Sequence, residues 1–225
     1  MQRRTFVTAT PVLAAATAAS APARAQAPGK RRPIVLVHGA GHGGWCWRDV
    51  RRLLQAEGFE VFAPTMTGLG ERVHLRSAQV SLRTHITDIV NVIEFEELTD
   101  VVLVGHSYAG TVVTAVCDAL KPRIAHVIII DGAVPKDGEA TFPGITMAEM
   151  DKRYGGLIDG YLIPKLNTAG LGFPDPESEQ ARWLKRRLTE HLAQVWAEPV
   201  SLPNGGTDGV PRTYVQCADP KTMSP

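Results

Sequence analysis

Residues 101–110 read Val-Val-Leu-Val-Gly-His-Ser-Tyr-Ala-Gly, and this stretch decides the fold. Four apolar β-forming residues run directly into a Gly-x-Ser turn, and an apolar helical pattern follows over 111–120. A serine at a sharp strand-to-helix turn is held with its hydroxyl exposed above the edge of a sheet, in the arrangement called a nucleophile elbow. The same turn points the first N–H groups of the helix towards that hydroxyl. We therefore predict that Ser107 is a nucleophile.

Apolar runs and helical patterns alternate along the chain on both sides of this stretch. We expect strands at 33–37, 60–63, 101–104 and 126–130. We expect helices at 45–57, 82–98 and 111–120, the first with Val50, Leu53 and Leu54 facing the core. Such alternation is typical of βαβ units with a parallel sheet and right-handed crossovers. The predicted fold class is α/β, with a mainly parallel sheet flanked by helices.

The alternation stops after Val134. Residues 135–209 hold scattered Gly and Pro, helical patches at 147–154 and 179–196, and no clear pattern of a strand. We predict a mostly helical cap over about 135–209, followed by a further strand at 213–217, within one domain over 33–225. Five cap residues would either face a pocket or pack in the core: Met147, Met150, Tyr154, Leu157 and Trp196.

The first 27 residues have the pattern of a targeting segment. Arg3-Arg4 is followed by Phe6 and by an Ala- and Thr-rich run to about Ala23, after which come small-x-small cleavage sites. This pattern resembles a bacterial twin-arginine signal, with an ordinary secretory signal or an uncleaved anchor as alternatives. We exclude residues 1–27 from the fold and expect export to the periplasm or the medium through the cell's export machinery.

Composition excludes some classes of partner. The chain has 225 residues and a formal net charge of +1, from 24 basic and 23 acidic residues, which gives no sign of a nucleic-acid partner. The three cysteines, Cys46, Cys117 and Cys217, show neither Cys-x-x-Cys spacing nor a zinc-like pairing with histidine. We expect no structural disulfide, no metal and no cofactor.

Three motifs, each at the end of an expected strand, resemble those of the alpha/beta hydrolases. They are His-Gly-Ala-Gly-His-Gly-Gly-Trp at 38–45, Thr-Gly-Leu-Gly-Glu-Arg at 67–72, and the Ser107 elbow. The resemblance covers 33–135 well and 211–219 more loosely, and it points to small esterases, plant methylesterases and hydroxynitrile lyases. It implies hydrolysis of a small, fairly apolar carboxylic ester through an acyl-enzyme on Ser107.

The resemblance also assigns roles in the first loop. The backbone N–H groups of Ala40 and Tyr108 would form an oxyanion hole, which stabilises the negative charge that develops on the carbonyl oxygen. Gly39, Gly41 and His42 would form the loop against which the substrate lies. In the general pattern a glycine stands two residues after the serine, and here Ala109 stands there, with Gly110 next.

The acid and the base of the family follow the serine in chain order. Asp219, just after the expected late strand, is the first candidate acid, and Asp131, at the end of the fourth strand, is the alternative. His191 is the last histidine, and its helical surroundings predict a surface position. The resemblance implies a final strand, a base histidine and a final helix that this sequence does not contain, so we expect a C-terminally truncated chain without its general base.

Two other functions stay open beside ester hydrolysis. The first is a cyanohydrin lyase on the same scaffold. Lyases of this group carry threonine where this chain has Gly39, which favours the esterase. The second is a ligand-binding pseudohydrolase without catalysis, which the absent base would explain.

Overall fold

A five-stranded parallel sheet forms the centre of the part of the chain that the computed structural model describes, residues 31–142, 144–166, 173 and 175–218. The strand order is β2-β1-β3-β4-β7, and all neighbouring strands run parallel. The strands are β1 (Ile34–Val37), β2 (Val61–Phe62), β3 (Val101–His106), β4 (Ile124–Ile130) and β7 (Arg212–Val215). The predicted α/β fold with a mainly parallel sheet is confirmed.

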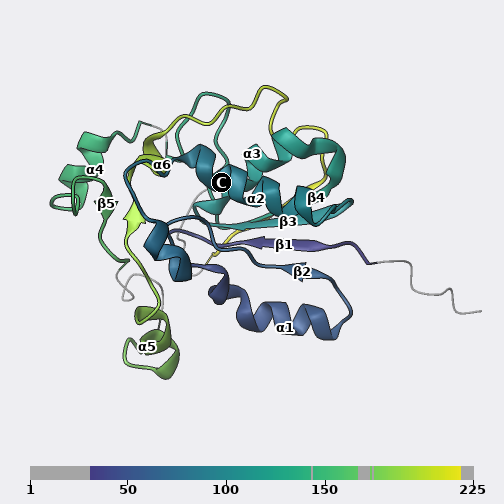
Figure 1. Ribbon diagram of the computed structural model, residues 1–225, viewed down its shortest axis with the longest axis horizontal. Helices are drawn as coiled ribbons and strands as arrows, with labels where there is room; N and C mark the ends of the chain where they lie inside the picture. Colours follow the sequence, from purple (N-terminus) through teal and green to yellow (C-terminus); the bar gives the residue numbers. More distant parts are fainter. Residues whose placement is uncertain (1–30, 143, 167–172, 174, 219–225) are drawn as a thin grey trace, which may run out of the picture. The chain divides into compact units, whose positions relative to one another are not determined.

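Helices lie on both faces of this sheet (Figure 1). The α-helices of the sheet region are α1 (Arg48–Ala56), α2 (Leu82–Phe95) and α3 (Ala109–Leu120). Short 3-10 helices occur at η1 (Gly44–Trp47), η2 (Gly70–Leu75) and η3 (Lys121–Arg123). Helix α2 starts at a capping box in which Ser81 and Thr84 each accept the backbone N–H of the other, so its first turn is fixed by local sequence.

Helices α2 and α3 pack on one face of the sheet and form the main core with alternate residues of β1, β3 and β4. Helix α3 is buried from Ala109 to Asp118, as its uniformly apolar pattern predicts. The buried Asp118 carboxylate accepts the backbone N–H groups of Asn204 and Gly206 at 2.9 and 2.7 Å. A polar group on a buried helix is thereby satisfied, and it anchors the loop that leads into β7.

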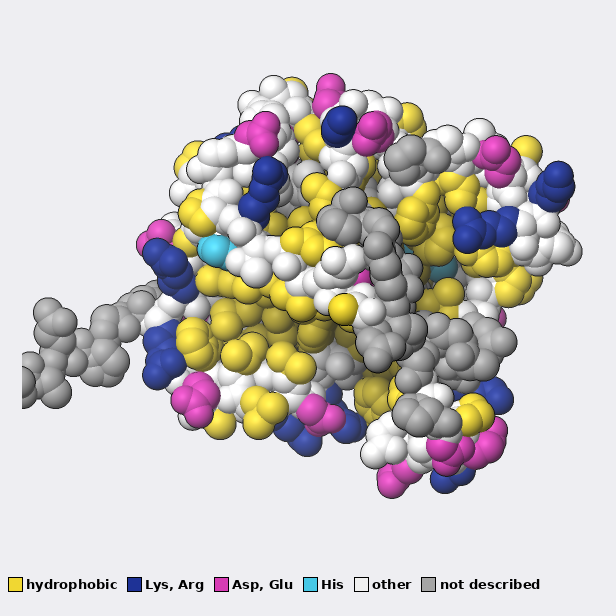
Figure 2. Space-filling view, turned by 180° about the vertical axis from the view of Figure 1, so that it is seen from behind, with side chains coloured by type: hydrophobic (Ala, Val, Ile, Leu, Met, Phe, Trp, Pro, Cys, Tyr) yellow, Lys and Arg dark blue, Asp and Glu magenta, His cyan; other side chains and the backbone are white. Residues whose placement is uncertain are grey.

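Helix α1 covers the opposite face of the sheet, and the expectation for its apolar side is wrong in part. Leu54 is half-buried against the sheet, but Val50 and Leu53 are 41% and 70% exposed. Other described residues therefore cover only part of the apolar side of α1. The β4 residues Ile128 and Ile130 on this face are only partly buried, and Figure 2 shows a hollowed face on which hydrophobic side chains gather.

The segment after β4 is a mixed cap and not a purely helical one. It contains α4 (Met147–Arg153), β5 (Leu162–Ile163), α5 (Glu179–Lys185), β6 (His191–Leu192) and α6 (Gln194–Ala197). Strands β5 and β6 pair antiparallel, so the expectation of no strand here is wrong. The single helix expected over 179–196 is also wrong, because the chain leaves the helix after Lys185 and becomes extended at His191.

Several expectations concern residues outside this description. The signal pattern at 1–27 and the candidate acid Asp219 both lie outside the described residues. Cys46, Cys117 and Cys217 are described and are free thiols. Among the described residues, no helix is long and apolar enough to cross a bilayer, and no group of three or more His, Cys, Asp or Glu could hold a metal ion.

Candidate active site

Ser107 lies in the tight turn between β3 and α3, as the sequence predicts. Its φ of +54° is in the left-handed region, which costs a non-glycine residue about 1–2 kcal/mol. The turn is held by main-chain hydrogen bonds on both sides: the Ser107 N–H donates to the Ile130 carbonyl at 3.0 Å, and the Ser107 carbonyl accepts the N–H groups of Gly110 and Ala133. A backbone strained at one serine and fixed by its neighbours is a feature of functional sites.

Two glycines allow this turn to pack. A Cβ on Gly105 would lie 2.7 Å from the Ala109 carbonyl oxygen, and a Cβ on Gly110 would lie 2.2 Å from the carbonyl oxygen of Ala133. Ala109 is itself fully buried and fits. Gly110 therefore allows the start of α3 to approach the loop after β4, while Ala109 occupies the position where the general pattern has a glycine.

The first loop lies directly against the elbow. A Cβ on Gly39 would be 3.2 Å from the Ser107 Cβ and 2.9 Å from Nδ1 of His106, so a residue with a side chain would press on the turn. Ala40 and Tyr108 are buried, and neither backbone N–H donates a hydrogen bond to any described residue. Two unpaired N–H groups from two converging segments are what an oxyanion hole needs.

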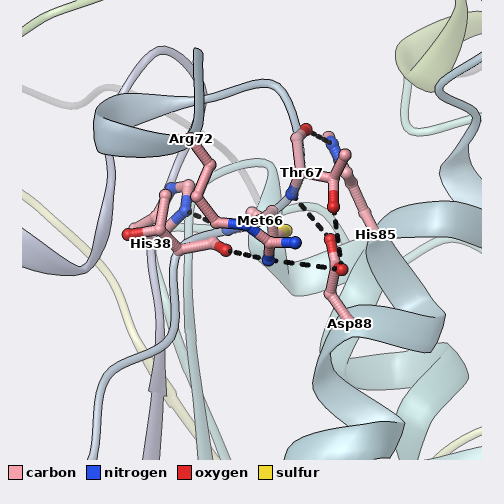
Figure 3. Close-up of polar contacts among 7 residues, drawn as sticks. His38, Met66, Thr67, Arg72, His85 and Asp88 are labelled. Atoms are coloured by element: carbon pink, nitrogen blue, oxygen red, sulfur yellow. Dashed lines mark hydrogen bonds and ion pairs between the residues drawn. The ribbon is translucent and has the colours of Figure 1, made fainter. Parts of the chain in front are cut away.

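The side chain of Tyr108 contacts a buried polar network beneath the elbow through His85. Figure 3 shows the part of this network around Thr67, His85 and Asp88. His85 of α2 accepts the Tyr108 hydroxyl at Nδ1, 2.9 Å away, and donates Nε2–H to the Thr67 carbonyl, also at 2.9 Å. Asp88, one turn further along α2, accepts the N–H and hydroxyl of Thr67 at 2.6 and 2.9 Å and forms an ion pair with Arg72 at 3.4 Å. The motif at 67–72 therefore orders the loop that supports Tyr108.

Burial keeps the histidines of this region neutral. It lowers the pKa of His38 to about 3 and that of His85 to about 4. His38 accepts the Met66 N–H at Nε2 and donates Nδ1–H to the Gly39 carbonyl, so it is a structural residue of the first loop. Both ring nitrogens of His38 and of His85 have hydrogen-bond partners, so these neutral rings are not free to act as bases.

His42 and His106 stand beside the loop. His42 donates Nδ1–H to the Ala40 carbonyl at 2.7 Å and stacks on Trp45, with the ring centroids 5.5 Å apart. His106 lies against Gly39, and burial lowers its pKa to about 4, with His42 lowering it further and Asp131 acting in the opposite direction. None of the described histidines forms a hydrogen bond with Ser107.

The cap reaches the first loop through β6 and the residues before it. The Gly41 carbonyl accepts the Thr189 N–H at 2.9 Å, and the Gly41 N–H donates to Nδ1 of His191 at 3.3 Å. The expectation that His191 is a surface residue is wrong, since it is 1% exposed. Apolar residues at helical spacing around His191 led to the prediction of a surface helix. His191 lies instead in β6, and its ring is buried. Because both polar groups of the Gly41 backbone are engaged, neither is free for a substrate.

Of the two candidate acids, Asp131 lies within the described residues and Asp219 lies outside them. Asp131 directly follows β4, is buried, and has a φ of +43°. Its N–H donates to the Val215 carbonyl at 2.7 Å, and its carboxylate accepts the Cys217 N–H at 3.3 Å. These contacts place Asp131 between β4 and the end of β7, near His106. Asp219 stays a prediction from chain order.

The five cap residues expected at a pocket or in the core all belong to the main apolar cluster. Met150 is fully buried and Trp196 is 8% exposed, with Met147, Tyr154 and Leu157 packed against the cluster. Trp196 contacts the ring of His191 at a centroid distance of 5.5 Å. Core packing is therefore the interpretation that the described contacts favour.

Sequence reasoning missed four residues that bear on this site: His85, Asp88, Thr189 and His191. A signal for His85 was available, because Leu82, His85, Ile89 and Ile93 are the buried stripe of α2 and His85 is its one ionisable member. A histidine on an apolar stripe needs a partner, and here the partner is the residue after the nucleophile. No comparable signal marks Thr189.

Comparison with known proteins agrees with this geometry. A family model described as the alpha/beta hydrolase family matches residues 34–225. A carbendazim hydrolyzing esterase of Nocardioides sp. (strain SG-4G) is 38% identical over 189 residues, which cover 81% of this chain and 78% of that protein. A putative chloroplastic methylesterase 13 of Arabidopsis thaliana is 32% identical over 109 residues, which cover 48% of this chain and 24% of that protein.

Solved structures show the same fold. An extracellular alpha/beta-hydrolase from a Paenibacillus species, described as sharing structural and functional homology with Tobacco Salicylic Acid Binding Protein 2, superposes with a TM-score of 0.68 at 22% identity. The match covers 82% of this chain and 76% of that one. The parallel sheet, the elbow and the family match lead to one conclusion: the chain belongs to the alpha/beta hydrolase family.

Proposed function

We propose that this chain is a serine hydrolase that cleaves small carboxylic esters through an acyl-enzyme on Ser107. The observation that carries the proposal is that Ala40 and Tyr108 are buried, and that their backbone N–H groups donate to no described residue, beside a serine held at a φ of +54°. An ester whose carbonyl oxygen accepts both N–H groups would have its carbonyl carbon next to the serine hydroxyl. The esterase and methylesterase names of the relatives support the same reaction class.

Each group would have a separate task in this reaction. The Ser107 oxygen attacks the ester carbonyl carbon and forms a bond to it, while the Ala40 and Tyr108 N–H groups stabilise the negative oxygen. The ester C–O bond then breaks, and the alkoxy group takes the proton removed from the serine and leaves as the alcohol. Water then hydrolyses the acyl-serine to the acid and free serine. The serine proton needs a base, which an acid, Asp219 or alternatively Asp131, would orient. Gly39 and His42 would lie beside the bound ester.

The test uses the protein with the downstream base histidine that the resemblance implies, and compares it with its Ser107→Ala variant on short p-nitrophenyl esters and on carbendazim, the compound in the bacterial relative's name. Loss of the nucleophile should lower kcat by up to roughly a millionfold, as in subtilisin. Ser201→Ala, an exposed serine elsewhere, is the matched control and should keep full activity. Equal turnover by the wild type and Ser107→Ala would refute the assignment, as would cyanide release from mandelonitrile without ester cleavage.

A covalent label gives a second readout that does not depend on turnover. A fluorophosphonate should add its phosphonyl group to Ser107, with fluoride leaving, and peptide mass spectrometry locates the adduct. The label should be absent from Ser107→Ala and present in Ser201→Ala. Labelling at another residue would contradict the proposal.

We also propose that residues 1–27 direct export of the protein by the twin-arginine route, on the pattern of Arg3-Arg4 and the Ala-rich run that follows. Replacement of both arginines by lysine should stop export of a fused reporter. Export that is unchanged by the replacement would favour an ordinary secretory signal.

A further inference from the structure

The peptide bond between Ala40 and Gly41 is held from both sides by histidine rings. The Ala40 carbonyl accepts Nδ1–H of His42 at 2.7 Å, and the Gly41 N–H donates to Nδ1 of His191 at 3.3 Å. His42 belongs to the same loop, whereas His191 comes from the cap, 150 residues after Gly41. Together they fix the plane of the peptide that follows the Ala40 N–H.

The other peptide group of Gly41 is fixed by the cap as well. Its carbonyl accepts the N–H of Thr189 at 2.9 Å and the Thr189 hydroxyl at 3.4 Å. Gly41 has a φ of +68°, and a Cβ there would lie 2.9 Å from the Thr189 carbonyl oxygen. The loop and the cap therefore meet backbone to backbone at this glycine, with no space for a side chain.

His191 is in a state that suits an acceptor. Burial lowers its pKa well below the usual value, so the ring is neutral, and Nδ1 accepts from Gly41, so the ring proton is on Nε2. Nε2 is buried and has no hydrogen-bond partner among the described residues. An unpaired buried N–H is costly, and an apolar side chain would fill this space without that cost. The acceptor at Nδ1 is the property that an apolar residue could not supply.

The same ring contacts the second segment of the site. It packs on the ring of Tyr108, with the centroids 4.9 Å apart and the planes at 69°. His191 thus touches Gly41, the neighbour of one proposed oxyanion donor, and Tyr108, which carries the other. Among the described residues, no other side chain makes a hydrogen bond or ring contact to both Gly41 and Tyr108.

We propose that His191 is a positioning residue of the oxyanion hole: it holds the Gly41 N–H and packs on Tyr108, and so the cap sets the positions of both donors. The inference rests on the proposed function, because it assigns His191 to that site. The ring itself does not touch the reacting atoms. Its effect acts through the Ala40 and Tyr108 N–H groups, which must be in place when negative charge develops on the oxygen.

The test exploits two amide side chains that differ in reach. In His191→Asn the side-chain oxygen can stand where Nδ1 stands, whereas in His191→Gln the amide extends to the position of Nε2. His191→Gln should lower kcat about 10- to 100-fold with little change in KM, because donors displaced by a fraction of an ångström act mainly on the transition state. His191→Asn should retain kcat within about threefold of the wild type, because its oxygen replaces the Nδ1 acceptor.

Leu188→Ala is the control for loss of cap packing. Leu188 is 2% exposed, and its side chain makes no polar contact with Gly41. Its truncation should lower the melting temperature and leave kcat near the wild-type value. A fall of kcat in Leu188→Ala equal to that in His191→Gln would mean that any damage to the cap has the same effect, and it would overturn the assignment.

Amide exchange tests the inference separately from catalysis. The Gly41 N–H, followed by NMR, should exchange at least about tenfold faster in His191→Gln than in the wild type, and slowly again in His191→Asn, because exchange requires the hydrogen bond to open. A protein that carries the implied base histidine and still hydrolyses no ester would refute the proposed function, while this measurement would still report on the contact. Equal exchange in all three proteins would overturn the positioning role.

Discussion

Gly110→Ala tests whether the elbow depends on close packing between α3 and the loop after β4. In an ordinary helix this change stabilises a protein by about 1 kcal/mol, because alanine has the better helix propensity. At Gly110 the new Cβ would lie 2.2 Å from the Ala133 carbonyl oxygen, more than 1 Å inside ordinary contact. The steric argument therefore predicts the opposite sign, a loss of about 3 kcal/mol, at the upper end of typical overpacking.

The loss should be visible in both stability and rate. For a chain of this length, about 3 kcal/mol corresponds to a melting temperature about 6–12 °C lower, measured by circular dichroism. The clash would also displace the start of α3, including the Tyr108 N–H, and a shift of about 1 Å costs on the order of 100-fold in kcat. Gly138→Ala is the control: it has a φ of +77° and nothing within 4 Å, so it should lose some stability and keep kcat. A Gly110→Ala protein that melts above the wild type would refute the reasoning.

Two further perturbations concern the polar network below the elbow. His38 and His85, with pKa values of about 3 and 4, are neutral in the folded protein but take up a proton near pH 6.5 when the chain is unfolded. The free energy of unfolding should therefore fall as the pH drops below 6.5, by about 1.4 kcal/mol per pH unit for each histidine. Urea unfolding at pH 7 and pH 5 measures this difference, and equal stability at the two pH values would contradict it. Asp88→Ala removes the acceptor of the Thr67 N–H and the ion-pair partner of Arg72, and it should cost about 2 kcal/mol. Asp49→Ala, at an exposed ion pair, should leave the urea midpoint unchanged. A midpoint that shifts equally in both variants would show that Asp88 has no special role.

The elbow and the sheet could be predicted because their signals are local. The run 101–110 contains the strand, the turn and the start of the helix in ten residues, and the positive φ of Ser107 follows from that geometry. The same holds for the parallel order, since alternating strands and helices permit few topologies. The first loop could be placed beside Ser107 because parallel strands such as β1 and β3 end at the same edge.

The cap could not be predicted in the same way, because its structure depends on what it touches. Leu188, Leu192 and Val195 repeat at helical spacing, yet Leu192 lies in a strand that is two residues long and paired with β5. His191 looks like a surface residue until the Gly41 N–H is known to lie beside Nδ1. The exposed positions of Val50 and Leu53 likewise depend on which residues lie beside α1, which periodicity does not report.

The contact between Gly41 and His191 also affects when, during synthesis and folding, the site around Ser107 is complete. The loop at 39–41 is among the first parts of the domain to leave the ribosome, but its partner follows 150 residues later. At a synthesis rate of about 5–20 residues per second, the loop waits roughly 8–30 seconds for that partner. The sheet can form before the loop has its final shape, because β1, β3 and β4 pair without β6. Folding of this protein should therefore end at its reactive centre, with recovery of activity lagging behind recovery of secondary structure on refolding.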